Sequence, residues 1–155
     1  GNDSLLGGNG ADTLIGGAGD DILTGGDVSD TFRWSLNDTG SDKITDFNLA
    51  PVASGGDVLD LRDLLQGESV GASNSAGNLA DYLHFEISGS NTVIHISHTG
   101  GFGADSHSVG GSFTSGATTQ QIVLEGVNLQ SAYNGATTDQ QIITQLLNNN
   151  KLITD

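Results

Sequence analysis

GGNGADTLI-GGAGDDILT-GGDVSDTFR, residues 7–33, gives this chain its architecture. A unit of nine residues recurs three times without a break, and residues 1–6 continue it as the back end of an earlier unit. Each unit has Asp at its sixth place and an apolar residue at its eighth: Asp3, Asp12, Asp21 and Asp30, and Leu5, Leu14, Leu23 and Phe32. A flexible glycine-rich linker has no reason to hold this phase, so the pattern predicts a stack of similar coils.

The nine-residue unit predicts a tight turn followed by a very short strand. The glycines permit the positive φ angles of such a turn, and the apolar eighth residue points inward from the strand. Two units make one coil, so residues eighteen positions apart should stack on successive coils. Neighbouring strands lie ~4.8 Å apart and Ca²⁺ prefers oxygens at ~2.4 Å, so one ion fits between stacked turns. Such ions would bridge Asp3 to Asp21 and Asp12 to Asp30, with backbone carbonyls completing the oxygen shell.

The same stacking is unfavourable without a cation. Two carboxylates ~5 Å apart repel by roughly 3 kcal/mol at an effective dielectric constant near 20. One apolar residue per unit cannot offset several such pairs and the entropy of ordering the glycines. The sequence therefore predicts that calcium decides whether this region folds.

Composition supports a cation-binding protein. The chain has 155 residues and a net charge of −15, from 19 acidic residues and four basic ones. Clustered Lys and Arg are absent, which argues against nucleic acid and anionic membranes as partners. There is no Cys, and no apolar run approaches the ~18 residues of a membrane span, so we expect no membrane insertion. Because Gly1 falls in mid-pattern, we expect the natural N-terminus to lie elsewhere.

The acidic residues are concentrated in the first half of the chain. Of 16 Asp residues, 12 lie between Asp3 and Asp63, and the remainder of the chain is mostly polar and apolar. This asymmetry predicts two regions with different physical properties, one acidic and one nearly neutral.

The units resemble the RTX nonapeptide repeat, Gly-Gly-x-Gly-x-Asp-x-apolar-x, of proteins exported by bacterial type I secretion. Residues 31–34, 42–47 and 56–65 resemble the segment that closes RTX rolls. The remainder, to Asp155, resembles the C-terminal target domain of giant repeat-built bacterial adhesins, including biofilm and ice-binding ones. The resemblance implies a mainly β fold: a calcium-binding parallel β-roll over residues 1–47, capped by a small mixed β/α region with the secretion signal over residues 48–155.

The resemblance also implies the calcium ligands. They are the carbonyls of the second and fourth residues and the Asp of one turn, with the carbonyls of the first and third residues and the Asp of the facing turn. The implied sets are Gly8, Gly10 and Asp12 opposite Gly25, Asp27 and Asp30; Gly1 and Asp3 opposite Gly16, Ala18 and Asp21; and Gly17, Gly19 and Asp21 with Asp38 and Asp42 after the last repeat. Val28 departs from the pattern, since it stands where the fourth glycine belongs.

Three further carboxylates admit two interpretations. Asp46, Asp57 and Asp60 could bind calcium or cap turns, with Asp60 as the N-cap of a short helix over residues 61–66. We favour capping.

The second half predicts ordinary β and α elements. Residues 83–88, 92–98 and 120–125 have the pattern of strands, with a hairpin turn at residues 89–91. Residues 76–82 predict one helical turn. Thr138-Asp139-Gln140-Gln141 is a capping box that starts a helix ending near Asn149. These elements would shield the open end of the roll.

The C-terminal segment, Leu146 to Asp155, has two expected roles. The resemblance implies that the exporter recognises it uncleaved, and after folding it can pack as an ordinary terminal helix.

The sequence offers no catalytic motif. The His-Glu-x-x-His and Gly-x-Ser-x-Gly motifs are absent, and the four histidines are expected to be solvated loop residues. We therefore expect no catalytic residues, no organic cofactor and no enzymatic activity.

These observations favour a non-enzymatic calcium-binding module at the C-terminal end of a secreted bacterial adhesin. Its expected partners are Ca²⁺ and the type I machinery, an ABC transporter and an outer-membrane channel, and its expected state is a monomer, secreted or on the cell surface. The alternative is the C-terminal tail of a secreted RTX hydrolase, a protease or lipase. A ligand-binding surface would rest only on Trp34, Tyr82 and Tyr133, which are more often core residues.

Overall fold

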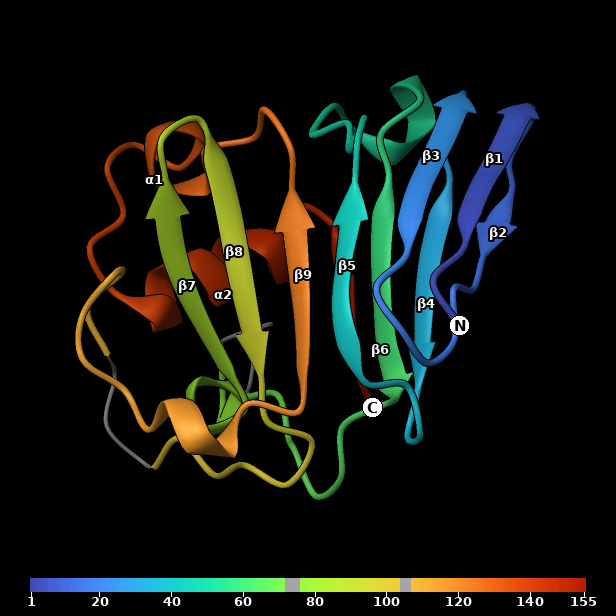
Figure 1. The fold of residues 1–155 in the computed structure, drawn as a ribbon. Coiled ribbons are helices and arrows are strands. Elements are labelled where there is room, and N and C mark those ends of the chain that lie inside the picture. The colour runs from blue at the N-terminus through green and yellow to red at the C-terminus, as the bar shows by residue number, and fades with distance from the viewer. Residues whose placement is uncertain (72–75, 104–106) are drawn as a thin grey trace.

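The computed structural model describes residues 1–71, 76–103 and 107–155, which form two β-sheets and two short α-helices (Figure 1). The strands are β1 (Ser4–Asn9), β2 (Thr13–Leu14), β3 (Ile22–Asp27), β4 (Thr31–Ser35), β5 (Gly40–Ile44), β6 (Val58–Asp63), β7 (Leu83–Ser88), β8 (Asn91–Ile96), β9 (Gln120–Leu124) and β10 (Leu152–Ile153). The helices are α1 (Leu129–Ala132) and α2 (Asp139–Asn148), with 3₁₀ turns at Val52–Ser54, Leu79–Asp81 and Ser115–Ala117.

The repeats form a parallel β-roll. The chain passes alternately between the two sheets, so that β1, β3 and β5 lie side by side in one and β2, β4 and β6 in the other, all parallel. Ser4 pairs with Ile22 and Thr13 pairs with Thr31, so the predicted eighteen-residue coil is confirmed.

The eighth residue of each repeat supplies the core between the two sheets. Leu14 is 4% exposed, and Leu23 and Phe32 are fully buried. After the repeats the same positions are continued by the buried Ile44, which pairs with Leu23, and the buried Leu59, which pairs with Phe32. The predicted inward direction of the eighth position is therefore confirmed for these three units.

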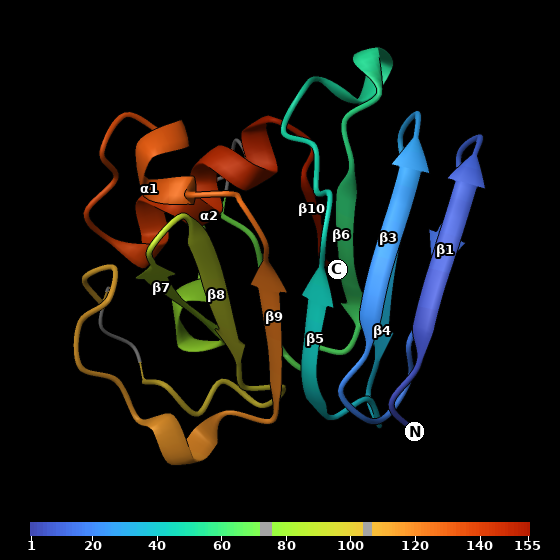
Figure 2. The same cartoon turned by 45° about the horizontal axis from the view of Figure 1, so that its top comes forward.

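The second half extends both sheets of the roll. β9 pairs in parallel with β5 and antiparallel with β8, which pairs with β7, giving a six-stranded sheet (Figure 2). The predicted hairpin is present, with Gly89 at φ 64°, and so is the capping box in which Thr138 and Gln141 exchange bonds at the start of α2. The mainly β fold, a parallel roll with a small mixed β/α cap, is confirmed. Both sheets cross the boundary predicted at residues 47 and 48, which stays a prediction about folding units.

The C-terminus is part of the roll. β10 pairs in parallel with β6, at the end of the four-stranded sheet. Immediately before it, the Lys151 side chain is fully buried and its ammonium donates to the carbonyls of Asn48 and Ala50. The last residues therefore hold together a turn made about one hundred residues earlier in the chain.

Two expectations were wrong. Asp60 is no helix N-cap, because it lies in the middle of β6, where its carboxylate accepts hydrogen bonds from the side chain of Arg62. The tertiary pairing of β6 with β4 overrides the local helical pattern. The histidines are also not all solvated, because His84 and His95 are buried on neighbouring strands.

Candidate metal centre

The turns of the repeats stack on both sides of the roll. Turns 7–12 and 25–30 follow β1 and β3 at one side, and turns 1–3 and 16–21 lie at the other. The stacked turns are very close: a Cβ at Gly26 would lie 2.2 Å from the Gly8 carbonyl oxygen. A Cβ at Gly19 would lie 2.5 Å from the Gly1 carbonyl oxygen. Only glycine leaves room at these two places for the carbonyl of the preceding coil.

The repeat aspartates form a ladder of hydrogen bonds from coil to coil. The backbone N–H of Asp3 donates to Asp21 Oδ1 at 2.7 Å, and that of Asp12 donates to Asp30 Oδ1 at 2.8 Å. The ladder continues beyond the repeats, because the Asp21 N–H donates to Asp42 Oδ1 and the Asp30 N–H donates to Asp57 Oδ1, each at 2.9 Å. One oxygen of each of these carboxylates therefore holds the neighbouring coil in register.

The second carboxylate oxygen distinguishes the repeats from the rest of the ladder. Oδ2 of Asp12, Asp21 and Asp30 is buried and has no hydrogen-bond partner within residues 1–71, 76–103 and 107–155. Asp21 and Asp30 are only 1% and 0% exposed. A buried anionic oxygen without a donor is costly, and Ca²⁺ is a cation that binds through carboxylate and carbonyl oxygens. The residues present therefore fit calcium.

The structure brings together the first two predicted ligand sets. Turn 7–12 faces turn 25–30, with Gly8 paired to Gly26 and Asn9 paired to Asp27. Turn 1–3 faces turn 16–21, where the Gly1 nitrogen donates to the Ala18 carbonyl. When calcium is bound, it would supply the positive charge that the unpaired Oδ2 atoms lack.

The third predicted set is held differently. Asp42 Oδ2 accepts from the indole N–H of Trp34 at 2.6 Å and from the Gln120 amide at 2.8 Å, and Asp38 Oδ2 accepts from the Ser35 N–H at 2.7 Å. Gly17 and Gly19 keep the positive φ of a repeat turn. Protein donors thus reach the carboxylates of Asp38 and Asp42, and calcium at this set stays a prediction.

Asp46 and Asp57 cap the last turn of the other stack. Asp46 accepts from the N–H groups of Gly25 and Gly26, each at 2.9 Å. Asp57 accepts from the N–H groups of Asp30 and Asn48. Both oxygens of each carboxylate are therefore satisfied, which is the capping role that we favoured.

Val28 occupies the glycine place of its turn at φ 81°. A left-handed conformation costs a β-branched residue roughly 1–2 kcal/mol, which exceeds the entropy that glycine would lose on folding. We expect Val28→Gly to stabilise the calcium-bound protein by about 1 kcal/mol in urea unfolding. Val28→Ala, which keeps a Cβ at the same φ, is the control. A Val28→Gly variant that is no more stable than Val28→Ala would contradict the inference that the backbone is strained at Val28.

Burial raises the pKa of Asp30, with a smaller contribution from the charges of Asp12 and Asp46, and burial likewise raises the pKa of Asp42 and Asp57. A raised folded-state pKa stabilises the fold at low pH, and this stabilisation is lost as pH rises through the raised pKa values. As the pH falls from neutral toward 3.8, the ordinary pKa of Asp, a larger fraction of the metal-free protein should therefore be folded.

With calcium bound, the stability of the protein should instead decrease as the pH falls over the same range, because protons compete with the ion for these oxygens. The strand content of decalcified protein and the urea unfolding of calcium-saturated protein, each followed by circular dichroism from neutral to acidic pH, measure this. Parallel pH dependence in the two samples would contradict it.

Two groupings were missed by sequence reasoning. Gln120 lies 78 positions from Asp42, and nothing local marks it as a partner. His84, His107 and Asp139 also converge although they lie in separate segments. The capping box did mark Asp139 as the first residue of a helix, but the burial of His84 required knowledge of the sheet order.

The comparisons with known proteins agree with the repeat geometry. Residues 1–32 match the family model of the RTX calcium-binding nonapeptide repeat, in four copies. The chain therefore carries RTX calcium-binding repeats, and calcium is their metal. Repeats of this kind are typical of secreted proteins.

Among solved structures, the chain is similar to the AlgE6R3 subunit of the mannuronan C5-epimerase from Azotobacter vinelandii. The two are 26% identical with a TM-score of 0.48, over 79% of this chain and 60% of that one. The chain thus spans less than two thirds of that subunit. No curated protein matches. Among the described residues, no helix has the length and apolarity to cross a membrane.

Proposed function

We propose that this chain is a non-enzymatic, calcium-folded module at the C-terminal end of a secreted bacterial adhesin, and that its last residues carry a type I secretion signal. The observation that carries the calcium-folding part is the buried, unpaired Oδ2 of Asp12, Asp21 and Asp30. In the cytosol calcium is too scarce to fill weak sites. Outside the cell, millimolar calcium suits sites of ~10⁻⁴–10⁻³ M affinity.

The position of the C-terminus supports export in the unfolded state. In the folded chain β10 is hydrogen-bonded to β6, and Leu152 is buried beside Lys151. A transporter that reads Leu146–Asp155 could reach this segment only before the roll forms. Folding on extracellular calcium would then hide the segment and oppose backward movement through the channel.

Secretion from cells that carry a type I exporter tests the proposal. Deletion of residues 146–155 should abolish secretion of the chain. A variant with Asp12, Asp21 and Asp30 all changed to Asn keeps the C-terminal segment, so it should still be exported, but calcium should no longer increase its strand content by circular dichroism. Undiminished secretion of the deletion variant would overturn the signal assignment.

The alternative is the tail of a secreted hydrolase whose catalytic domain lies upstream. The β7–β9 sheet and the terminal helix resemble adhesin ends more than enzyme tails. A protease or lipase motif in the sequence before Gly1 of the parent protein would decide for the hydrolase.

A further inference from the structure

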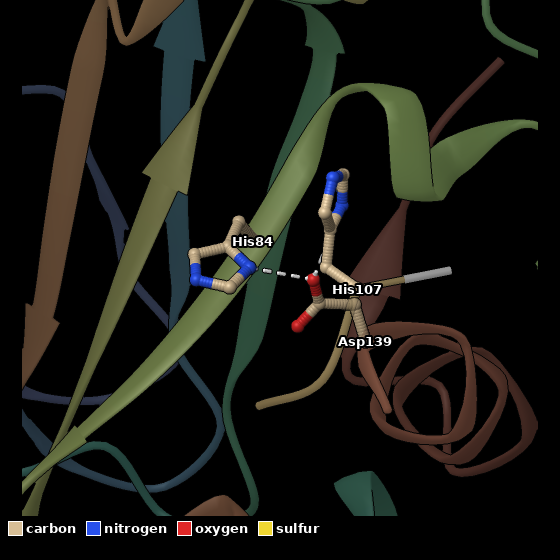
Figure 3. Close-up of side chains that lie close together, drawn as sticks. All are labelled: His84, His107 and Asp139. Atoms are coloured by element: carbon tan, nitrogen blue, oxygen red, sulfur yellow. Dashed lines mark hydrogen bonds and ion pairs between the residues drawn. The ribbon is translucent and has the colours of Figure 1, made fainter. Parts of the chain in front are cut away.

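Three side chains that commonly bind transition metals converge behind the hairpin sheet, away from the repeats (Figure 3). His84 comes from β7, Asp139 is the first residue of α2, and His107 lies in the segment before the bridge of Ser108 to Thr138. One ligand atom from each side chain lies within 4.8 Å of the other two. This is the one such group among the residues that the structure describes.

We propose that His84, His107 and Asp139 form a second metal site, separate from the calcium turns, that takes a Zn²⁺-class transition ion. Two imidazoles and one carboxylate are the ligands of zinc rather than of calcium, which takes oxygens alone. A fourth position would be left to water.

The distances are close to those that a tetrahedral ion requires. Ligands at 2.0–2.1 Å from zinc lie roughly 3.3 Å from one another. His84 Nδ1 lies 2.7 Å from Asp139 Oδ2, and His107 Nδ1 lies 3.9 Å from the same oxygen. One separation would widen and the other would close, each by roughly 0.6 Å, to admit the ion.

The hydrogen-bond inventory also points to a missing ligand. His107 Nδ1 is buried and has no hydrogen-bond partner among the residues that the structure describes, and its 3.9 Å distance from Asp139 is too long for a hydrogen bond. His84 Nε2 is buried without a partner as well, so the pair of histidines leaves two ring nitrogens unsatisfied. Binding through Nδ1 would move the His84 proton to Nε2. It would also give His107 Nδ1 a partner, which the described part of the chain does not supply.

The surroundings hold two of the ligands in place. Asp139 Oδ1 accepts from the backbone N–H of Phe85 at 3.0 Å, which fixes the carboxylate and leaves Oδ2 toward the histidines. The His84 ring stacks on Phe113 at a centroid distance of 4.1 Å. His84 and Asp139 are both fully buried. An oriented carboxylate and a packed imidazole are the outer-shell features that tune metal ligands.

Calorimetric titration of ZnCl₂ into folded, calcium-saturated protein tests the site. The wild-type chain should bind one Zn²⁺ per molecule, and its thermal midpoint should rise with zinc. His107→Ala should weaken zinc affinity at least tenfold and abolish the rise of the midpoint. This variant keeps its backbone, so the hydrogen bond of the Asp139 N–H to the His107 carbonyl remains. His98→Ala, which changes a histidine outside the group, should bind zinc as the wild type does.

Replacing zinc by Co²⁺ gives a second readout. Wild type should develop the visible absorption of four-coordinate cobalt, and His107→Ala should not. If folded wild type binds no zinc saturably, or if His107→Ala binds it as tightly, the proposal is overturned and His84 and Asp139 are a structural hydrogen-bonded pair. The zinc titration and the cobalt spectrum do not depend on the export proposal. Calcium is present in both experiments so that the protein is folded.

Discussion

Replacing Asp30 by Asn should remove about 2–3 kcal/mol of the stability that calcium confers, and should stabilise the metal-free protein. A site of ~10⁻⁴ M affinity in ~10 mM calcium contributes about 2.7 kcal/mol to folding by mass action, and that term requires the carboxylate. Without calcium the carboxylate is a liability, because it is fully buried and its Oδ2 is unpaired. An amide oxygen can still accept the Asp12 N–H, and the amide nitrogen can donate toward the carbonyls of the turn.

The matched control is Asp27→Asn. It makes the same change of charge in the same turn, but the Asp27 side chain is exposed and only its backbone carbonyl belongs to the predicted ligand set. Its calcium-dependent stability should stay within about 0.5 kcal/mol of wild type. Urea unfolding followed by circular dichroism measures the stability of all three proteins in calcium, and their strand content in EDTA shows how far each one folds without the ion.

The Asp30→Asn substitution should lower stability in calcium and raise it in EDTA, so the two conditions should give opposite results. A general loss of packing would destabilise Asp30→Asn with and without calcium. Equal losses in both conditions would contradict the proposal that the unpaired oxygen is a calcium ligand. So would a wild-type chain whose strand content is unchanged on chelation.

Trp34→Ala should cost about 3–5 kcal/mol, the largest loss that we expect from a core substitution in this chain. Trp34 is fully buried in β4, and its indole N–H donates to Asp42 Oδ2, which also accepts from Gln120 of β9. The side chain therefore packs in the core and also stabilises the place where β9 joins the roll. Its removal leaves a large cavity and takes one of the two donors from Oδ2 of the buried Asp42 carboxylate.

Two further variants separate these effects. Trp34→Phe keeps most of the apolar volume and lacks the N–H, so it should cost about 1–2 kcal/mol. Leu36→Ala removes a side chain that is 40% exposed and should cost about 0.5 kcal/mol or less. Circular dichroism is the readout, because Trp34 is the one Trp of the chain and both Trp34 variants lose its fluorescence. A loss below ~1 kcal/mol for Trp34→Ala would contradict its role in the core.

The roll was predictable because its determinants are local and periodic. The Asp ladder and the inward Leu14, Leu23 and Phe32 follow from one unit repeated in phase, so a stacking rule reproduces the register. The hairpin at Gly89 and the capping box at Thr138 were predictable for the same reason, since each depends on a few adjacent residues.

The remaining features depend on contacts between distant segments. The coil lengthens from eighteen residues to 21 and 27 after the repeats, as the bonds of Asp21 to Asp42 and of Asp30 to Asp57 show. No local pattern fixes those lengths. Asp60 was misplaced because a strand and a short helix fit the same residues, and only pairing with β4 selects the strand.

The site at His84 could not be predicted from spacing. Its ligands are separated by 55 positions between His84 and Asp139, and the sheet order alone brings them together. The sequence around an isolated histidine on a strand of alternating polarity does not show whether its side chain is buried, because burial depends on the neighbouring strands.

The burial of Lys151 bears on when this chain can fold. While the ribosome is still making the protein, β6 lacks its outer neighbour and the carbonyls of Asn48 and Ala50 lack the ammonium that they bind in the finished fold. The roll can therefore be completed only once residues 151–153 have left the ribosome, and a product that stops before Lys151 would lack these contacts. The time needed for synthesis therefore delays folding, and chains that are still incomplete cannot complete the roll.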